Sequence, residues 1–413
     1  DGMTEDIKVR AQNMNGAIHE DSVELHLINN FSSKIEGRIT KVIERKLSEF
    51  TGTIEDNKDF AFFIPNNKKI YSDFFIKKRN SEKFDNKKKY LAKITSWTGG
   101  KKPFAKVIRS IGDIGSNEAE IHTIMHDFNL PYKFSEEVEK ETDKLNDIIS
   151  EKEIGKRKDL RKEISFTIDP DDAKDFDDAL SIKINNDLYE IGIHIADVSH
   201  FFNSKGLINK EAEKRATSVY LVDRTIPMLP EKLSNDLCSL RPNVDRLTFS
   251  VLIKMNKDYE IVDKWIGRTV IHSKKRFTYE NAQDTIDQNK GEFLEELINL
   301  DRIAKHYRKK RFENGSFNFK SNEVKFQLDE KKKPIQIIKK ERKDTHKMVE
   351  EFMLLANKIV AEEINEYEKK YNKRYTFVYR IHEDPDKAKL VELKKYIKQF
   401  GYTINVDEKN LSS

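Results

Sequence analysis

The sequence predicts an α+β protein in which small β-barrels come first and a larger mixed α/β domain follows. Between residues 34 and 110, short strands separated by turns recur without a helical period, which is typical of a small closed barrel. Beyond residue 134, strands with alternating apolar residues are interspersed with amphipathic helices. At 413 residues, the chain has room for two or three domains with cores of their own.

Residues 1–30 are interpreted as the end of a first barrel. Val23, Leu25 and Leu27 alternate with polar residues and predict one strand. The segment offers this strand little else to pair with. We therefore expect the beginning of the first barrel to be absent from this sequence.

Residues 31–133 are assigned to a second barrel and a connector. Strands are expected at 37–45, 50–54, 60–64, 70–76, 90–97 and 104–111. Turn residues separate them, as at Pro65-Asn66-Asn67 and Thr98-Gly99-Gly100. The pattern predicts a barrel of the OB or cold-shock type.

The same region is strongly basic. From Lys34 to Arg109 there are 20 Lys and Arg against 9 Asp and Glu, a net of +11, whereas the whole chain carries +5. Basic clusters are interleaved with aromatic residues, and the candidate contacts are Phe60, Phe62, Lys77 and Lys78. Aromatic rings stack on bases and lysines neutralise phosphates, so the region is typical of a single-stranded nucleic-acid surface. The alternative is that about half of the aromatics fill the barrel core, as strand alternation requires.

An acidic stretch lies early in the larger domain, which is assigned to residues 134–413. Six Asp residues stand between Asp169 and Asp178, and strand-like alternation flanks them at 164–168 and 180–184. Like charges this close repel, so they are kept either solvated or around a cation. An EF-hand is excluded, because Lys174 and Leu180 stand where its Gly and Glu are required. A solvated acidic turn remains the alternative to a Mg²⁺ site.

Periodicity predicts the other elements of the larger domain. Helices are expected from Ser135, whose hydroxyl can cap the first turn, and at 209–218, 292–312, 344–372 and 384–400. Strands are expected at 189–198, 248–255, 261–272, 323–328, 334–340 and 377–381. A metal site at His194, Asp197 and His200 is disfavoured, because alternation along a strand turns Asp197 to the face opposite the two histidines.

No apolar run approaches the length needed to span a membrane. The single cysteine, Cys238, has no partner for an internal disulfide and stands between apolar neighbours. We expect a buried thiol in a protein of the reducing cytoplasm, without membrane contact.

Several motifs occur in an order that resembles the ribonuclease II and ribonuclease R family. They are Thr167-Ile168-Asp169 with the acidic stretch up to Ala179, His194-Ile195-Ala196-Asp197-Val198, Thr217-Ser218-Val219-Tyr220, Ile226-Pro227-Met228-Leu229-Pro230, residues 233–240, Val349-Glu350-Glu351-Phe352-Met353 and Tyr379-Arg380-Ile381-His382. The resemblance spans nearly all of residues 17–401 and leans towards ribonuclease R. It implies that the larger domain is an RNB catalytic domain.

The resemblance further implies a Mg²⁺-dependent, processive exoribonuclease that degrades RNA from its 3′ end to 5′-mononucleotides in RNA decay and processing. Asp169 and Asp178 would be metal ligands, and Asp175 and Asp177 would complete the metal site and help to place the attacking water. Tyr220 would stack against the 3′-terminal nucleotide, and Glu350 or Glu351 would help to hold its ribose. The implied partner is single-stranded RNA with a free 3′ end, bound by a monomer.

The sequence also departs from the family. Complete members continue into an Arg-containing segment and an S1-type barrel, and neither is present in the 413 residues. We therefore expect the RNB domain to be incomplete at its C-terminal end. The alternative function is an RNA-binding segment that is catalytically incompetent on its own, and a DNA-directed nuclease is a third option.

Overall fold

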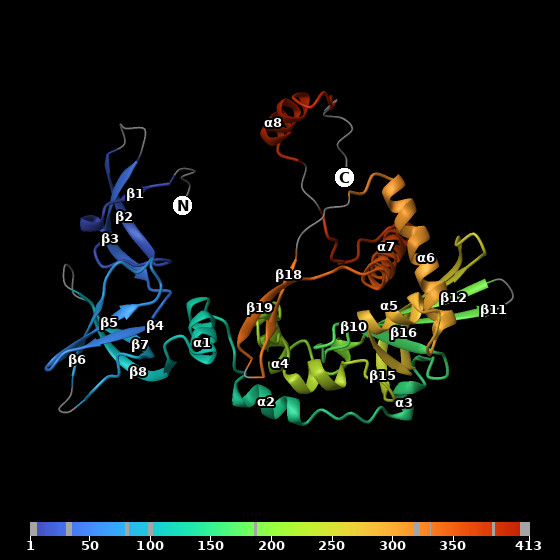
Figure 1. Cartoon of the computed structure of the whole chain (residues 1–413), viewed down its shortest axis with the longest axis horizontal. Coiled ribbons are helices and arrows are strands. Elements are labelled where there is room, and N and C mark those ends of the chain that lie inside the picture. The colour runs from blue at the N-terminus through green and yellow to red at the C-terminus, as the bar shows by residue number, and fades with distance from the viewer. Residues whose placement is uncertain are drawn as a thin grey trace. The chain divides into compact units, whose positions relative to one another are not determined.

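The computed structural model describes residues 6–29, 35–78, 82–97, 102–185, 188–317, 323–330, 332–381 and 385–404. The chain forms two compact units, and many of their helices and strands are labelled in Figure 1. The first comprises residues 1–148, 198–239 and 318–341, and the second comprises residues 149–197, 240–317 and 342–413. Barrel strands come first and a mixed α/β unit follows, which confirms the predicted fold class.

The first unit begins with a three-stranded sheet in the order β1-β3-β2. Its strands are β1 (Lys8–Val9), β2 (Ser22–Asn29) and β3 (Glu36–Glu44). The sequence predicts that β3 belongs to the second barrel, and this is wrong: β3 pairs antiparallel with β2 and parallel with β1. The reason is that an isolated strand leaves its backbone groups unpaired, so β2 takes the next strand along the chain.

The five strands after β3 close into the predicted barrel, in the order β4-β5-β6-β8-β7. They are β4 (Glu49–Asp56), β5 (Phe60–Pro65), β6 (Phe74–Lys77), β7 (Lys88–Ser96) and β8 (Phe104–Asp113). Phe63 and Phe74 are fully buried in the barrel core, with rings stacked 5.6 Å apart. At Gly52 in β4, a Cβ atom would collide with the carbonyl oxygen of Ile64, so only glycine allows this strand contact.

Short helices and hairpins complete the first unit. The helices are η1 (Ala11–Asn13), α1 (Asn117–Asp127), α2 (Glu136–Asp143), η2 (Val198–His200), α4 (Leu207–Arg215) and the π-helix η3 (Lys232–Leu237). The hairpins are β13 (Val219–Tyr220) with β14 (Thr225–Ile226), and β18 (Val324–Leu328) with β19 (Pro334–Lys339). Ser135 caps α2 as predicted, because its side chain accepts the backbone N–H of Val138.

The second unit is built on a seven-stranded sheet in the order β17-β10-β11-β12-β15-β16-β9. Its strands are β9 (Lys158–Asp159), β10 (Ser165–Asp169), β11 (Asp178–Asn185), β12 (Leu188–Ala196), β15 (Asp245–Met255), β16 (Ile261–His272) and β17 (Lys275–Thr278). Its helices are α3 (Glu151–Ile154), α5 (Tyr279–Asp287), α6 (Leu294–Glu313), α7 (Asp344–Tyr371) and α8 (Lys387–Lys398).

One hydrophobic core joins this sheet to α5, α6 and α7, which lie beside it in Figure 1. Met348, Phe352, Leu355 and Ile359 are all buried in this core. They recur at helical spacing, so the apolar face predicted for α7 is confirmed.

The region after α7 differs from expectation. Residues 377–381 form no strand, and Val378 and Ile381 are 90% and 81% exposed. These residues have no strand partner in the part of the chain that the structure describes, and an unpaired segment cannot form a ladder. The last helix begins at Lys387 and is followed by Gly401 at φ 81°, whereas Asp384, where its start is predicted, lies outside the described residues.

Within the described ranges, every helix is too short or too polar to cross a bilayer.

Candidate active site and nucleic-acid interface

The acidic loop, residues 170–177, connects two adjacent strands of the second unit's sheet. Asp169 is the last residue of β10 and Asp178 is the first of β11, and these strands pair antiparallel. Two backbone hydrogen bonds hold the far end of the loop: Leu240 N–H donates to the carbonyl of Phe176 (2.8 Å), and Ala196 N–H to that of Asp177 (3.0 Å). The loop therefore brings the two predicted metal ligands to one edge of the sheet.

The carboxylates of this loop differ in exposure. Asp169 is only 7% exposed and Asp178 is half-buried, whereas Asp171, Asp172 and Asp177 are exposed. Asp171 and Asp172 are not among the candidate metal ligands, but exposure does not separate the two sets, because Asp177 is also exposed. Asp175 is half-buried.

Burial and mutual repulsion make these carboxylates unusually basic. Loss of solvation raises the pKa of Asp169 to about 7, and the negative charge of Asp178 adds to this shift. Loss of solvation also raises the pKa of Asp178 to about 6, with Asp177 as the charged neighbour. The pKa of Asp177 is also raised, by partial loss of solvation even though the side chain is exposed, and by repulsion from Asp175. Such a group of acids gains stability from a nearby cation.

The donor set suits a hard divalent cation. Oδ2 of Asp169 is buried and has no hydrogen-bond partner among the described residues, so an acceptor oxygen is available to a metal ion. Mg²⁺ prefers carboxylate oxygens and takes only one or two of them from the protein. In the described ranges no three His, Cys, Asp or Glu side chains already converge as a metal-binding group. The loop thus offers Mg²⁺ a few carboxylates rather than a complete set of protein ligands.

Tyr279 is a neighbour of these carboxylates that the sequence does not reveal. It is the first residue of α5, directly after β17, and its ring stacks on His346 at 3.8 Å. Loss of solvation raises its pKa to about 12, and the charges of Asp178 and Asp169 contribute. Its hydroxyl therefore remains protonated at neutral pH and can donate a hydrogen bond beside the carboxylates.

Arg276 is a second neighbour missing from the predicted set. It stands on β17, opposite Thr167 of β10. Its Nη2 donates to the carbonyl oxygens of Pro170 (2.5 Å) and Asp171 (2.9 Å). For Arg276 and Tyr279, the only local signal is the sequence around Thr278, which is typical of a helix start. The sequence does not show that β17 pairs with β10, because these segments lie about a hundred positions apart.

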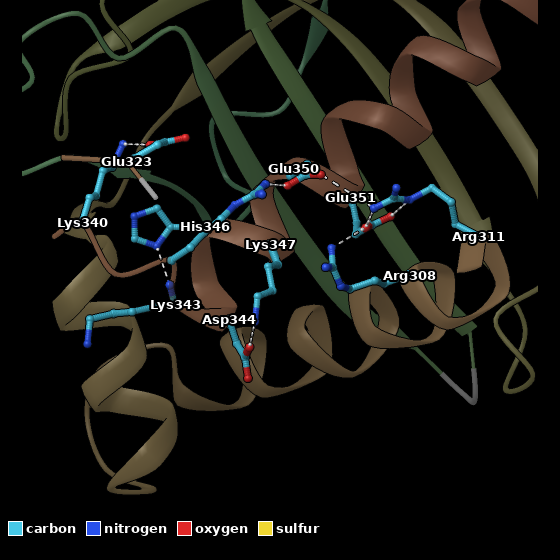
Figure 2. Close-up of polar contacts among 11 residues, drawn as sticks. Arg308, Arg311, Glu323, Lys340, Lys343, Asp344, His346, Lys347, Glu350 and Glu351 are labelled. Carbon is cyan, nitrogen blue, oxygen red and sulfur yellow. Dashed lines mark hydrogen bonds and ion pairs between the residues drawn. The ribbon is translucent and has the colours of Figure 1, made fainter. Parts of the chain in front are cut away.

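Glu350 and Glu351 lie on α7 in different environments, as Figure 2 shows. Glu351 is 4% exposed and accepts hydrogen bonds from two arginines of α6, Arg311 (Nε–Oε2 3.2 Å) and Arg308 (3.4 Å). Glu350 is half-buried and pairs with Arg342 and, at 3.7 Å, with Arg311. Glu351 therefore ties two helices together, and Glu350 has the more accessible carboxylate.

Tyr220 ends the short strand β13 in the first unit. Its side chain is 69% exposed. The ring is therefore largely accessible to solvent.

The barrel presents an aromatic surface made of Phe60, Phe62, Phe75 and Phe104. Their rings contact one another at centroid distances between 5.2 and 5.9 Å, and Lys102 lies 4.3 Å from the centre of Phe62. Phe60 and Phe104 are each 38% exposed. The aromatics of β5 and β6 thus divide as strand alternation predicts, with Phe63 and Phe74 in the core.

The two predicted lysines of the barrel differ. Lys77 is exposed at the end of β6. The Lys78 side chain is 9% exposed, and its Nζ contacts Asp56 (2.7 Å) and the carbonyl of Asn57. Lys77 therefore presents its charge to solvent, whereas the charge of Lys78 is paired with Asp56.

His194 and Asp197 both contact neighbouring side chains within the second unit. His194 is buried between Ser181 (2.9 Å) and Ser250 (2.8 Å), and Asp197 pairs with Arg157 at 2.7 Å. Burial lowers the pKa of His194 to about 4, so it is neutral at pH 7.

Comparison with known proteins identifies both parts of the chain. Residues 157–413 match the RNB domain family, and residues 62–135 match the cold shock domain family. Ribonuclease R of Thermotoga maritima is 35% identical over 407 residues, which are 96% of this chain and 56% of that protein. The chain thus spans little more than half the length of this relative.

Solved structures agree on the fold. RNase R of Mycoplasma genitalium in complex with ribose-methylated single-stranded RNA superposes with a TM-score of 0.87 at 23% identity, covering 98% of this chain and 64% of that one. The same protein in complex with double-stranded RNA gives a TM-score of 0.81 at 23% identity, covering 90% and 66%. Because the RNB match covers more than half of its residues, the chain belongs to the RNB domain family, that of ribonuclease II and ribonuclease R.

Proposed function

We propose that the protein is a Mg²⁺-dependent exoribonuclease that hydrolyses single-stranded RNA processively from a free 3′ end and releases 5′-mononucleotides. One observation carries this proposal: the buried Asp169 ends β10 and the half-buried Asp178 begins the adjacent strand β11, so two mutually repelling carboxylates lie at the same end of the sheet. The family membership and the relatives named ribonuclease R support RNA as the substrate. A cytoplasmic monomer is proposed with it; the lone buried cysteine suits that compartment.

The acidic residues of the site would each have a role in the reaction. Asp169 and Asp178 would hold the cation, and Asp175 and Asp177 would complete the site and accept hydrogen bonds from the attacking water. When bound, Mg²⁺ supplies positive charge to the oxygens that gain charge during phosphodiester hydrolysis. No side-chain nucleophile is required, because water attacks the phosphorus directly.

Other residues would hold the substrate. Tyr220 would stack on the 3′-terminal base, and Glu350, the more accessible of the two glutamates, would accept a hydrogen bond from the terminal ribose. The barrel would bind the RNA further from its end through Phe60, Phe62 and Lys77. Stacking and phosphate contacts bind a strand without reading its sequence, as a processive enzyme requires.

Direction and sugar preference test this function. A single-stranded RNA labelled at its 3′-terminal nucleotide should release labelled mononucleotide at once in Mg²⁺, whereas the same RNA labelled at its 5′ end should release label last. A matched deoxyribose strand should be hydrolysed poorly, because the ribose hydroxyl is absent. Release of the 5′ label first would overturn the direction, and equal rates on both strands would overturn the substrate class. RNA that is bound and left intact would indicate a binding segment instead.

A further inference from the structure

Arg276 reaches across from β17 to the first turn of the acidic loop. Besides donating to the carbonyls of Pro170 and Asp171, its guanidinium lies 3.9 Å from the Asp171 carboxylate. The Ala173 N–H donates to the Pro170 carbonyl as well (3.1 Å). The guanidinium of Arg276 therefore holds together the turn that follows Asp169.

The same guanidinium also contacts the other end of the loop. It lies 5.6 Å from the centre of the Phe176 ring, and Phe176 is buried. Phe176 stands between Asp175 and Asp177, so its position helps to set theirs. One side chain thus contacts the loop just after Asp169 and again just before Asp178.

The charge of Arg276 opposes the repulsion within the loop. Its positive charge attracts the Asp169 carboxylate, which the negative charges of Asp178 and Asp177 repel. Carboxylates that carry like charges repel one another and tend to open the loop. The guanidinium counters this repulsion with its positive charge, and its hydrogen bonds to the backbone fix the shape of the loop. Arginine is suited to this task because its planar fork donates in fixed directions and stacks on aromatic faces.

We propose that Arg276 is a positioning residue of the active site: it holds the acidic loop in the shape in which Asp169 and Asp178 receive one cation. The inference rests on the proposed function, since it assigns Arg276 to the cation site of that reaction. Arg276 itself contacts the loop backbone, the Phe176 ring and the exposed Asp171. The other carboxylates of the loop would take part in the chemistry.

The test measures Mg²⁺ binding, by calorimetric titration, separately from RNA hydrolysis. Arg276→Gln should bind Mg²⁺ about 10- to 100-fold more weakly than the wild type, as is usual when a group that orients ligands is removed. Its kcat should fall while KM for RNA is unchanged. Arg276→Lys, which keeps the charge without the fork, should recover only part of the affinity. Circular dichroism establishes folding, and Arg276→Lys carries the test if Arg276→Gln does not fold.

Arg161→Gln is the matched control. Arg161 is an arginine of the same unit that pairs with Asp159 (2.7 Å) and Asp245 (3.1 Å), so its loss removes ion pairs without touching the acidic loop. It should keep wild-type Mg²⁺ affinity. Wild-type affinity in Arg276→Gln would overturn the role of Arg276 and leave the cation site standing. If Asp178→Asn binds Mg²⁺ as the wild type does, the cation site fails and the role of Arg276 fails with it.

Discussion

Asp169 lies opposite Thr278 in the parallel pairing of β10 with β17. Thr278 in turn caps α5, because its side chain accepts the backbone N–H of Asn281 at 2.9 Å. One strand pair thereby places a helix start, with Tyr279 as its first residue, beside the carboxylate that ends β10. The candidate site is thus assembled by the sheet from segments that are distant in the chain.

The aromatic surface of the barrel should bind RNA. Phe60→Ala should weaken binding of a single-stranded RNA by about 5- to 100-fold, because stacking one base on an aromatic ring contributes about 1–3 kcal/mol. Fluorescence anisotropy with a labelled oligonucleotide measures the affinity. Phe128→Ala removes an aromatic ring that is 73% exposed on the same unit outside this surface, and its affinity should equal that of the wild type. Equal losses in both variants would contradict the assignment of the surface.

Glu351 should stabilise the second unit far more than its neighbour Glu350. Glu351→Gln leaves two arginines facing a neutral, buried partner and should lower the free energy of unfolding by about 3 kcal/mol. Glu350→Gln weakens a half-buried ion pair and should lower the free energy of unfolding by less than about 1 kcal/mol. Chemical denaturation followed by Trp265 fluorescence measures both, in a Trp97→Phe background because the chain has two tryptophans. Similar losses in the two variants would refute the distinction.

The buried His194 should make the second unit sensitive to acid. Its pKa is about 4 in the folded protein and 6.5 ordinarily, so between these values the unfolded chain binds the extra proton. Its contribution to stability is therefore full above pH 6.5 and is lost as the pH falls towards 4. Relative to His194→Gln, the wild type should lose up to about 1 kcal/mol per pH unit in this window. Parallel pH profiles of the two proteins in denaturant titrations would show that His194 is not the responsible group.

Gly192 should be intolerant of a side chain because it makes room for His194. A Cβ atom there would lie closer than 3.0 Å to Oγ of Ser181 and to the His194 ring. Gly192→Ala should cost about 1–3 kcal/mol through overpacking. Gly155→Ala, whose Cβ would meet the carbonyl oxygens of Glu151 at 3.4 Å and Lys152 at 3.9 Å, should change stability by less than about 0.5 kcal/mol. A Gly192→Ala protein as stable as Gly155→Ala would disprove this packing.

Local patterns predict much of this molecule. The stripe of Met348, Phe352 and Leu355 predicts α7, and the Ser135 cap predicts the start of α2, because helix periodicity and capping are properties of neighbouring residues. The acidic stretch between two alternating segments likewise predicts the loop between β10 and β11.

Which strand pairs with which other strand cannot be predicted in the same way. The local sequence does not show that β3 pairs with β2 rather than with a barrel strand, because a strand can pair with any other strand of suitable length. Arg276 and Tyr279 escape prediction for the same reason: they join the site only through the pairing of β17 with β10. Glu350 and Glu351 look equivalent in sequence, and only the tertiary structure, which buries Glu351 against Arg308 and Arg311 of α6, distinguishes them.

The central claim, that the acidic loop holds the cation for RNA hydrolysis, is tested most directly at Asp178. The measurement is the rate of mononucleotide release from single-stranded RNA in Mg²⁺ by Asp178→Asn and by Asp172→Asn, an exposed acid of the same loop. Asp178→Asn should lose about 100-fold or more of this rate, because the transition state loses several kcal/mol of charge stabilisation, while RNA binding persists and Asp172→Asn keeps wild-type activity. Release by Asp178→Asn at the wild-type rate would contradict the account.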